Sequence, residues 1–524
     1  MKKFFRIIFG RLFWTGLLLL IELAILVYLL ITVTTVIEGD LYWIYYIVFG
    51  LVWLFTLVMM SVIVNSSANT SYKTLWLVAV GIFPVVGPTF YLLFGNKNAT
   101  KRMKRKVAPI KKAMKMIEPS DELKEQITSL DDGINALNIS SYIRKAAHTN
   151  IYQDTEVTYF PLGDKVYKVM LEELKKAEHY IFIEYFIIEK GKFWDSILKI
   201  LKEKALQGVD VRVMYDDMGS IGTLPLRYPK KLEQFGIKCY AFNRFKPFLN
   251  VKLNNRDHRK IMVIDGHTGF SGGINLADEY LNEKVRFGHW LDNAIMLKGK
   301  AVHALTQLFL TTWCPHFGTM PEISNRKYQW NHFLPEGYSY KSDGFVQPYG
   351  DIPFDDEAVG ERVYLSLIYN AKKTLYITTP YLIIDDELEG ALCTAAKRGV
   401  DVKLLVPHIP DKKLVFSITR SYYQKLIPAG VEVYEYTPGF VHEKIFISDD
   451  HMATVGTINL DYRSLLLHME NGIFLFNCSI IKEMQEDFLK NIEKSELITA
   501  RRYKSIKKGK RLIWSALRLF APLM

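Results

Sequence analysis

The fold of this chain is decided by a stretch that occurs twice, HRKIMVID at residues 258–265 and HEKIFISD at residues 442–449. Extending the alignment to residues 258–276 and 442–460 gives nine identities in 19 positions. A second phrase also recurs, as ALQGVDVRV at 205–213 and AKRGVDVKL at 396–404. Recurrence over about 190 residues is too long for a short-period solenoid, so we expect a duplicated α/β lobe.

The repeated stretch places the same chemical groups at the same spacing in each copy. These groups are His258, Lys260 and Asn275 in the first copy, and His442, Lys444 and Asn459 in the second. Residues at positions i and i+2 of a strand point to one face, so the imidazole and the ammonium meet the same ligand atom. The asparagine, 17 residues after each His, adds an uncharged donor. We interpret the two sets together as a pocket for a phosphate diester.

Other catalytic patterns fit the sequence less well. Residues 269–273, GFSGG, match the GxSxG nucleophile turn, but the second copy is ATVGT and has no serine. The chain contains no GxxxxGK[ST] loop, which argues against a nucleotide-driven phosphotransferase. The four cysteines form no CxxC pair, so we expect neither a zinc cage nor a disulfide framework.

The net charge of +12 is concentrated in two short patches. Residues 97–115 carry nine Lys or Arg and residues 501–511 carry seven, and neither patch contains an acid. The rest of the 524-residue chain is therefore mildly acidic, which argues against a nucleic-acid partner. Both patches adjoin apolar sequence, as expected for contact with an anionic lipid surface.

The first hundred residues are predicted to lie in a membrane. Residues 12–37 contain one ionisable side chain, Glu22, and residues 41–64 contain none, so each stretch is long and apolar enough to span a bilayer. A third apolar stretch, at 74–94, is interrupted by two prolines and a glycine. Because the bases near the N-terminus and those at 97–115 both favour the cytoplasm, we expect two spans and a re-entrant segment at 74–94. A kinked third span is the alternative.

These features divide the chain into five parts. They are a membrane domain at 1–96, a basic juxtamembrane linker at 97–150, a first lobe at 151–340, a second lobe at 341–500 and a basic tail at 501–524. Residues 510–524 have the pattern of a short amphipathic helix. Such a helix would lie on the lipid surface or pack on the catalytic lobes, and the pattern does not choose between the two.

The paired HxKxxxxD motifs resemble those of the phospholipase D superfamily. The wider pattern is similar to that of the bacterial cardiolipin synthases, through FPVVG at 83–87, TPY at 379–381, GFVH at 439–442, and NLDYRS at 459–464 followed by Glu470. The likeness covers nearly the whole chain. Two positions depart from the family pattern: Glu443 stands where a small residue is usual, and Ile384 where a proline is frequent. Either departure would bear on substrate preference rather than on the nucleophile.

The resemblance implies a fold and a reaction. The fold is α/β, with two duplicated phospholipase D-like α-β-α lobes related by pseudo-twofold symmetry and preceded by N-terminal transmembrane helices. The reaction transfers a phosphatidyl group from one phosphatidylglycerol to another and gives cardiolipin and glycerol through a phosphohistidine, without a metal or cofactor.

The resemblance also implies roles for single residues. His258 would be the nucleophile and His442 the general acid and base, following the family's usual order. Four residues would neutralise the phosphate charge: Lys260, Lys444, Asn275 and Asn459. Five would orient the site: Asp265, Asp449, Asp292, Ser464 and Glu470. For Asp265 and Asp449, a plain role in a turn stays open.

The same pocket suits other reactions, which also stay open. A phosphatidyl hydrolase or another headgroup transferase would keep the fold and the nucleophile and differ in the acceptor. A membrane-tethered nuclease would act on nucleic-acid diesters, although the charge distribution argues against it. We expect a multi-pass protein of the cell membrane, with its catalytic domain on the cytoplasmic side and with phosphatidylglycerol and cardiolipin as partners. Whether it forms a homo-oligomer stays open.

Overall fold

The computed structural model describes residues 42–66, 69–95, 118–244, 255–317, 343–355 and 357–523, and the single residues 28, 105 and 340. The chain forms two compact units. One comprises residues 1–102 and 245–253, and the other comprises residues 103–244 and 254–524. The second unit holds both copies of the repeated stretch, and we call it the catalytic unit.

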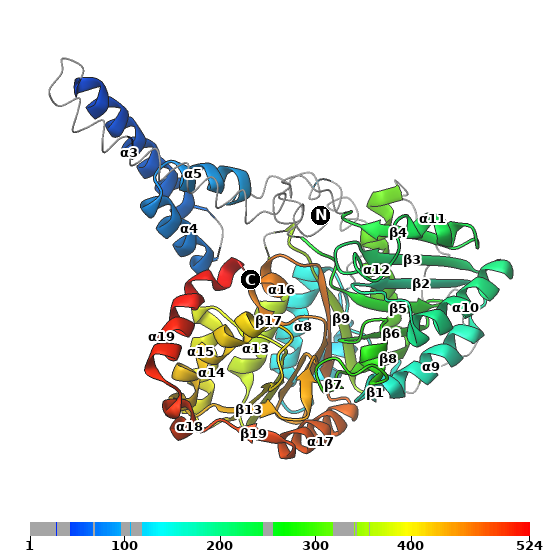
Figure 1. Ribbon diagram of the computed structural model, residues 1–524. Coiled ribbons are helices and arrows are strands. Elements are labelled where there is room, and N and C mark those ends of the chain that lie inside the picture. Colours follow the sequence, from blue (N-terminus) through cyan, green and yellow to red (C-terminus); the bar gives the residue numbers. More distant parts are fainter. Residues whose placement is uncertain are drawn as a thin grey trace. The chain divides into compact units, whose positions relative to one another are not determined.

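The first lobe of the catalytic unit is built on a seven-stranded sheet (Figure 1). Its strands are β1 (Thr155–Phe160), β2 (Tyr180–Tyr185), β3 (Asp210–Asp216), β4 (Lys238–Phe242), β5 (Lys260–Ile264), β6 (Thr268–Gly272) and β8 (Ala294–Gly299). Their order across the sheet is β1-β8-β6-β5-β2-β3-β4. β2, β3 and β4 pair in parallel, and the other pairings are antiparallel.

The second lobe repeats this sheet and adds one edge strand. Its strands are β9 (Phe345–Asp351), β10 (Thr374–Thr378), β12 (Asp401–Pro407), β13 (Glu432–Tyr436), β15 (Ile445–Ser448), β16 (Met452–Gly456), β18 (Glu470–Phe476) and β19 (Ser495–Leu497). The order β9-β18-β16-β15-β10-β12-β13-β19 matches the first sheet strand for strand up to β19. The prediction of two α/β lobes is therefore confirmed.

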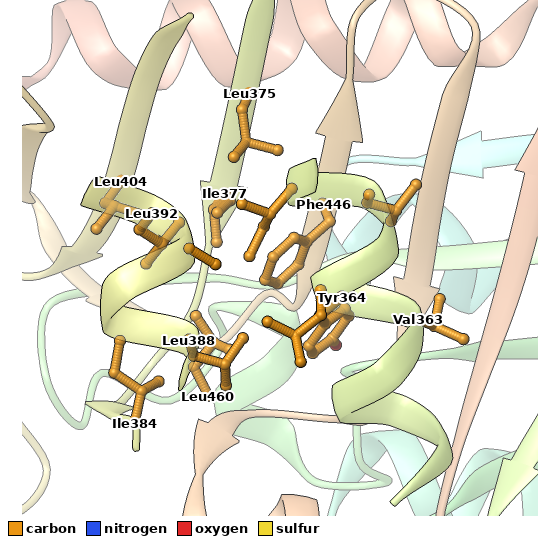
Figure 2. Packing of buried hydrophobic residues seen from close by; sticks show 14 of the residues in the cluster. Val363, Tyr364, Leu375, Ile377, Ile384, Leu388, Leu392, Leu404, Phe446 and Leu460 are labelled. Carbon is orange, nitrogen blue, oxygen red and sulfur yellow. The ribbon is translucent and has the colours of Figure 1, made fainter. Parts of the chain in front are cut away.

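Helices cover the sheets, and α12 (Val302–Phe317) is buried on nearly all sides in the core. The first lobe uses α9 (Gly163–Lys176), α10 (Lys192–Leu206), α11 (Tyr228–Glu233) and α12 (Val302–Phe317). The second uses α13 (Val359–Asn370), α14 (Asp386–Lys397), α15 (Lys413–Ala429) and α17 (Ile480–Glu493). Figure 2 shows α13 and α14 packing their apolar faces against the second sheet, where Tyr364 stacks on Phe446 with the ring centroids 3.9 Å apart. Burial of these apolar faces supplies most of the helices' stability.

A single hydrophobic core joins the two lobes. It contains Phe182 and Phe309 of the first lobe together with Tyr376 and Ile447 of the second. The catalytic unit also includes α7 (Asp121–Thr128) and α8 (Gly133–Ala147), which lie within the stretch predicted as a basic linker. Ile127 and Ile143 of these helices are buried in the core of the second lobe.

The other unit contains α3 (Tyr42–Val64), α4 (Thr70–Ile82), α5 (Val86–Phe90) and the π-helix η1 (Tyr91–Gly95). Within the described residues, one helical segment, Tyr46–Val64, is long and apolar enough to cross a membrane. The helix break expected at the prolines is present, because α4 ends before Phe83. Thr56 of α3 donates a hydrogen bond to the freed Pro84 carbonyl at 3.0 Å. The span predicted at 12–37 and the bases at 97–115 lie outside the described residues, apart from Tyr28 and Arg105.

The basic tail forms α18 (Ala500–Ser505), α19 (Lys508–Leu517) and the 3₁₀ helix η6 (Arg518–Leu523), drawn in red in Figure 1. One face packs on the second lobe, where Trp514 is buried and Arg518 pairs with Glu389 at 2.7 Å. The opposite face exposes four apolar side chains: Leu512, Ile513, Leu519 and Phe520. The tail therefore packs on the second lobe, as one expectation has it, and also exposes apolar side chains, as a helix on a lipid surface would.

Candidate active site

The two repeated histidines are held at the boundary between the lobes by backbone pairing. The His258 amide donates to the Met469 carbonyl at 2.8 Å, and the His442 amide donates to the Leu291 carbonyl at 2.7 Å. The second contact continues a short parallel pairing between β7 (His289–Leu291) and β14 (Gly439–Val441). Each histidine thus sits beside a strand of the other lobe, and closing the two lobes builds one site.

Each imidazole is also bound by a carboxylate from the opposite lobe. Nδ1 of His258 lies 2.9 Å from both carboxylate oxygens of Glu470, and Nδ1 of His442 lies 2.6 Å from Oδ2 of Asp292. Glu470 and Asp292 occupy equivalent positions, because β18 and β8 pair in the same register with β16 and β6. The other ring nitrogen of each histidine, Nε2, is left for chemistry.

The two carboxylates have different surroundings. Glu470 also accepts hydrogen bonds from Oγ1 of Thr457 at 2.5 Å and from Oγ of Ser464 at 2.7 Å. The residue aligned with Thr457 is Gly273, whose position is so close to Asp292 that a Cβ there would lie 1.9 Å from Oδ1. Glu470 is therefore within hydrogen-bonding distance of three side chains, and the first lobe has no room for the equivalent of Thr457.

The two lysines bring positive charge to both histidines. Nζ of Lys260 donates to the His258 carbonyl at 2.6 Å, and Nζ of Lys444 donates to the His442 carbonyl and lies 2.9 Å from Nδ1 of that ring. Burial lowers the pKa of Lys260 to about 7 and that of Lys444 to about 8, with Glu470 and Asp292 acting in the opposite direction.

Burial also sets the protonation of the acids and imidazoles. It raises the pKa of Asp292 to about 7, although Lys444 opposes this shift. It lowers the pKa of both His258 and His442 well below the usual range, and the two lysines add to the effect. At neutral pH both rings are therefore uncharged, and Asp292, with a pKa of about 7, is divided between its charged and its protonated form.

Asp265 and Asp449 lie away from this site. Each follows its strand, at the opposite end from the histidine, and adopts a positive φ. Asp265 accepts hydrogen bonds from the amides of residues 178, 179 and 180 at 2.7–2.8 Å, and Asp449 accepts them from the amides of residues 372, 373 and 374 at 2.7–3.0 Å. Both carboxylates join the start of a central strand to the neighbouring turn, which is the turn role that the sequence left open.

The two asparagines differ in their contacts. Oδ1 of Asn275 accepts from the Ile187 amide at 3.0 Å, and its Nδ2 donates to the Tyr280 hydroxyl at 2.6 Å. Asn275 is thus engaged by protein groups. The Oδ1 atom of Asn459 is buried without a hydrogen-bond partner among the described residues.

The structure adds residues that the sequence did not single out. Thr457 supports Glu470, and its only sequence signal is that it replaces the aligned Gly273. His468 lies next to His258, with the ring centroids 5.7 Å apart, and Trp290 lies next to His442 at 5.8 Å. The two rings occupy equivalent positions, each two residues before the carboxylate of its lobe. Because one residue is a histidine and the other a tryptophan, the repeat does not reveal either of them.

One group of potential metal ligands falls in this site. His258, His468 and Glu470 have ligand atoms within 4.8 Å of one another. The Glu470 oxygens are already engaged by His258, Thr457 and Ser464, however, so this set fits a hydrogen-bond network better than a metal centre.

Comparison with known proteins extends the resemblance. Residues 170–313 and 364–492 match the family described as cardiolipin synthase, PLD-like domain, and residues 51–96 match the phospholipase D-nuclease N-terminal family. The chain is 38% identical over 455 residues to a cardiolipin synthase of Alkalihalophilus pseudofirmus, covering 86% of this chain and 89% of that protein. It is 35% identical over 509 residues to a cardiolipin synthase of Halalkalibacterium halodurans, covering 96% and 99%.

A solved structure agrees with the fold. The phosphatidylserine synthase of Haemophilus influenzae aligns with a TM-score of 0.54 over 70% of this chain and 95% of that one, at 15% identity. At this identity the similarity supports the architecture of two lobes and nothing finer.

Proposed function

Because this chain belongs to the cardiolipin synthase family of phospholipase D-like proteins, we propose that it is a phosphatidyltransferase that converts two phosphatidylglycerol molecules into cardiolipin and glycerol. The observation that carries the proposal is the crossed pairing of each histidine with a carboxylate of the other lobe. This pairing leaves two Nε2 atoms for a nucleophile and a proton carrier in one site.

The surroundings of the carboxylates support His258 as the nucleophile. In this proposal, Glu470 accepts a hydrogen bond from the Nδ1–H group of His258, so the lone pair of that ring is on Nε2. At His442, protonated Asp292 or Lys444 donates to Nδ1, so this ring carries its proton on Nε2. One ring is thus prepared to attack phosphorus and the other to protonate a leaving oxygen.

The first step forms the covalent intermediate. Nε2 of His258 attacks phosphorus, and the bond from phosphorus to the oxygen of the headgroup glycerol breaks. The Nε2 proton of His442 goes to that oxygen while the proton of Asp292 moves to Nδ1, so the His442 ring stays neutral. Lys260 and Lys444 neutralise the nonbridging oxygens, with Asn459 as a further donor.

The second step reverses the proton movements. The terminal hydroxyl of a second phosphatidylglycerol attacks the phosphohistidine and gives its proton to Nε2 of His442, while the Nδ1 proton returns to Asp292. The phosphorus–nitrogen bond breaks, and cardiolipin is formed. Because one phosphodiester replaces another, the exchange needs no external energy source.

The membrane arrangement is part of the same proposal. We place the domain boundaries at 96, 150, 340 and 500, with α7 and α8 of the 97–150 segment packed on the second lobe. The membrane domain has two spans and a re-entrant segment at 74–94, the lobes have pseudo-twofold symmetry, and the catalytic unit lies on the cytoplasmic side of the cell membrane. The separation of α4 from α5 supports the re-entrant path. The exposed apolar face of α19 and η6, beside exposed Lys507, Lys508 and Lys510, suits an anionic lipid surface.

The function is tested by the lipid product. Purified full-length protein in vesicles of phosphatidylglycerol should release glycerol and form cardiolipin in equal amounts, and His258→Ala should form none. Phosphatidic acid as the main product would contradict the transferase and favour the hydrolase. Cleavage of DNA without any lipid turnover would favour the nuclease.

The contact of the tail with lipid has its own test. Leu512→Glu on α19 should raise the KM for phosphatidylglycerol in vesicles and leave the turnover of detergent-dispersed substrate unchanged. Leu206→Glu, at an exposed leucine of α10, is the matched control and should have no effect on either. Equal effects of the two variants would contradict the tail's role.

A further inference from the structure

His468 is a partly exposed histidine beside the nucleophile, and the reaction steps above do not use it. It lies between the short helix α16 (Tyr462–Leu466) and β18, and its amide donates to the Arg463 carbonyl at 2.8 Å. The side chain is 12% exposed, and its ring centroid is 5.7 Å from that of His258. Nδ1 lies 3.8 Å from Oε1 of Glu470, which is beyond hydrogen-bonding distance.

Both ring nitrogens of His468 are buried without a hydrogen-bond partner among the described residues. A buried polar group in this condition costs about 1–3 kcal/mol, so such groups are usually completed by a ligand or water. Burial lowers the pKa of His468 to about 4, and the ring is therefore neutral at physiological pH. A neutral imidazole offers one donor and one acceptor.

This donor and acceptor pair matches a hydroxyl group better than a phosphate. The nonbridging oxygens of a phosphodiester only accept hydrogen bonds, and Lys260 and Lys444 already bring cationic donors to the site. A hydroxyl both donates and accepts. In phosphatidylglycerol, the hydroxyls nearest the scissile phosphate belong to the glycerol headgroup.

The other half of the site lacks this pair. Trp290 occupies the position two residues before Asp292, as His468 does before Glu470, and its ring centroid is 5.8 Å from that of His442. An indole can donate but cannot accept a hydrogen bond. A side chain that can both donate a hydrogen bond to a hydroxyl and accept one from it is therefore present beside His258 and not at the equivalent position beside His442.

We propose that His468 binds a hydroxyl group of the phosphatidylglycerol headgroup and thereby selects lipids with a polyol headgroup. This inference rests on the proposed function and names a determinant of its substrate specificity. His468 contacts substrate in this role and takes no part in the proton transfers.

The test compares two lipids that differ only in the headgroup hydroxyls. The release of labelled headgroup, as glycerol from phosphatidylglycerol or as ethanol from phosphatidylethanol, is measured with the same acyl chains and with excess unlabelled free glycerol as the common acceptor. The proteins compared are the wild type, His468→Asn and His468→Phe. We expect the wild type to prefer phosphatidylglycerol by about tenfold or more, as rejection of a substrate that leaves a polar site unpaired would give. His468→Phe should lose this preference by slowing glycerol release only, and His468→Asn, which keeps a donor and an acceptor, should retain most of it.

Each result has a distinct meaning. An equal slowing of both lipids by His468→Phe, with unchanged thermal unfolding, would show that the ring acts through Glu470 and would overturn the inference. Absence of any preference in the wild type would overturn it as well. A wild type that forms no cardiolipin from phosphatidylglycerol would instead contradict the proposed function.

Discussion

In the first lobe, Asp292 contacts His442 and lies against a glycine, Gly273. In the second lobe, Glu470 contacts His258 and also accepts hydrogen bonds from the hydroxyls of Thr457 and Ser464. The scaffolds that present these groups share one strand order and one capping aspartate each. Duplication has thus preserved the frame while the carboxylate surroundings diverged. The comparison teaches that two copies of one motif can give their histidines carboxylates with different hydrogen-bonding partners by changing the residues around the motif.

The residues that follow the two histidines diverge in the same way. Arg259 is buried and pairs with Glu184 at 2.5 Å and with Asp257 at 3.2 Å. Glu443, at the aligned position, is buried with Oε1 lacking a hydrogen-bond partner among the described residues. Burial raises the pKa of Glu443, and the nearby Asp487 adds to the shift. The acid beside His442 therefore sits in surroundings that disfavour its charged form, whereas Arg259 is held as one partner of two ion pairs.

The largest expected effect separates the two histidines. Both His258→Ala and His442→Ala should lower kcat by about a thousandfold or more, because the nucleophile and the proton carrier act as a unit. Only the His442 variant should still accumulate phosphatidyl-enzyme, since His258 remains able to attack. Because the phosphorus–nitrogen bond of a phosphohistidine is labile in acid, the protein is quenched in denaturant at neutral pH, and peptide mapping with labelled phosphatidylglycerol would identify the modified ring.

The mapping has a clear contrary result. A labelled adduct on His442 in the His258→Ala variant would reverse the assigned roles, and with them the interpretation of the Asp292 and Glu470 surroundings. Retained cardiolipin synthesis in either variant would contradict the mechanism altogether.

A second experiment tests the carboxylates. Glu470→Gln removes the anion that holds the Nδ1 proton of His258, and we expect kcat to fall by about a hundredfold or more. Asp292→Asn keeps a donor for Nδ1 of His442 and should cost about tenfold or less. Ser464→Ala, which removes one hydrogen bond to the anion, should cost about tenfold. Its control is Tyr280→Phe at the aligned position, where the hydroxyl contacts Asn275 instead of the carboxylate.

The ranking is what matters in this set. Equal losses in Glu470→Gln and Asp292→Asn would mean that the two carboxylates do the same work and that the nucleophile cannot be assigned from their surroundings.

The dependence of kcat on pH should reflect the titration of Lys260 and Lys444. Lys260 and Lys444 act as cations, and their pKa values are lowered to about 7 and about 8. Their contribution is present at lower pH and is lost as the pH rises through this interval, and Asp292, with a pKa of about 7, loses its proton in the same direction. We expect kcat to decline severalfold between pH 7 and 9. Lys260→Arg should shift the decline upward because Arg stays charged, and an unchanged profile would contradict the role of Lys260.

The sequence predicts the frame and the paired His and Lys because duplication repeats them at one spacing. The repeat does not tell catalytic residues from structural ones. Asp265 is repeated just as His258 is, and yet its carboxylate binds backbone amides at the start of a strand. Ser464 and Glu470 were found through resemblance alone, since neither has an identical partner in the first copy. Thr457 and His468 were missed for the same physical reason. Their roles depend on contacts between distant segments, and the first copy has Gly273 and Trp290 in their places.

The smallest expected effect concerns the feature that the lobes share. Asp265→Asn and Asp449→Asn each weaken a carboxylate that accepts three backbone amides, and hydrogen bonds to charged groups are worth about 1.5–3 kcal/mol each. Since Asn keeps one acceptor oxygen, we expect each variant to lose about 1–3 kcal/mol of unfolding free energy and to retain kcat at temperatures where it is folded. Thermal unfolding and activity of the detergent-solubilised protein check both points. A loss of kcat without a loss of stability in only one variant would break the equivalence of the two frames, and would return that aspartate to the catalytic role implied by the resemblance.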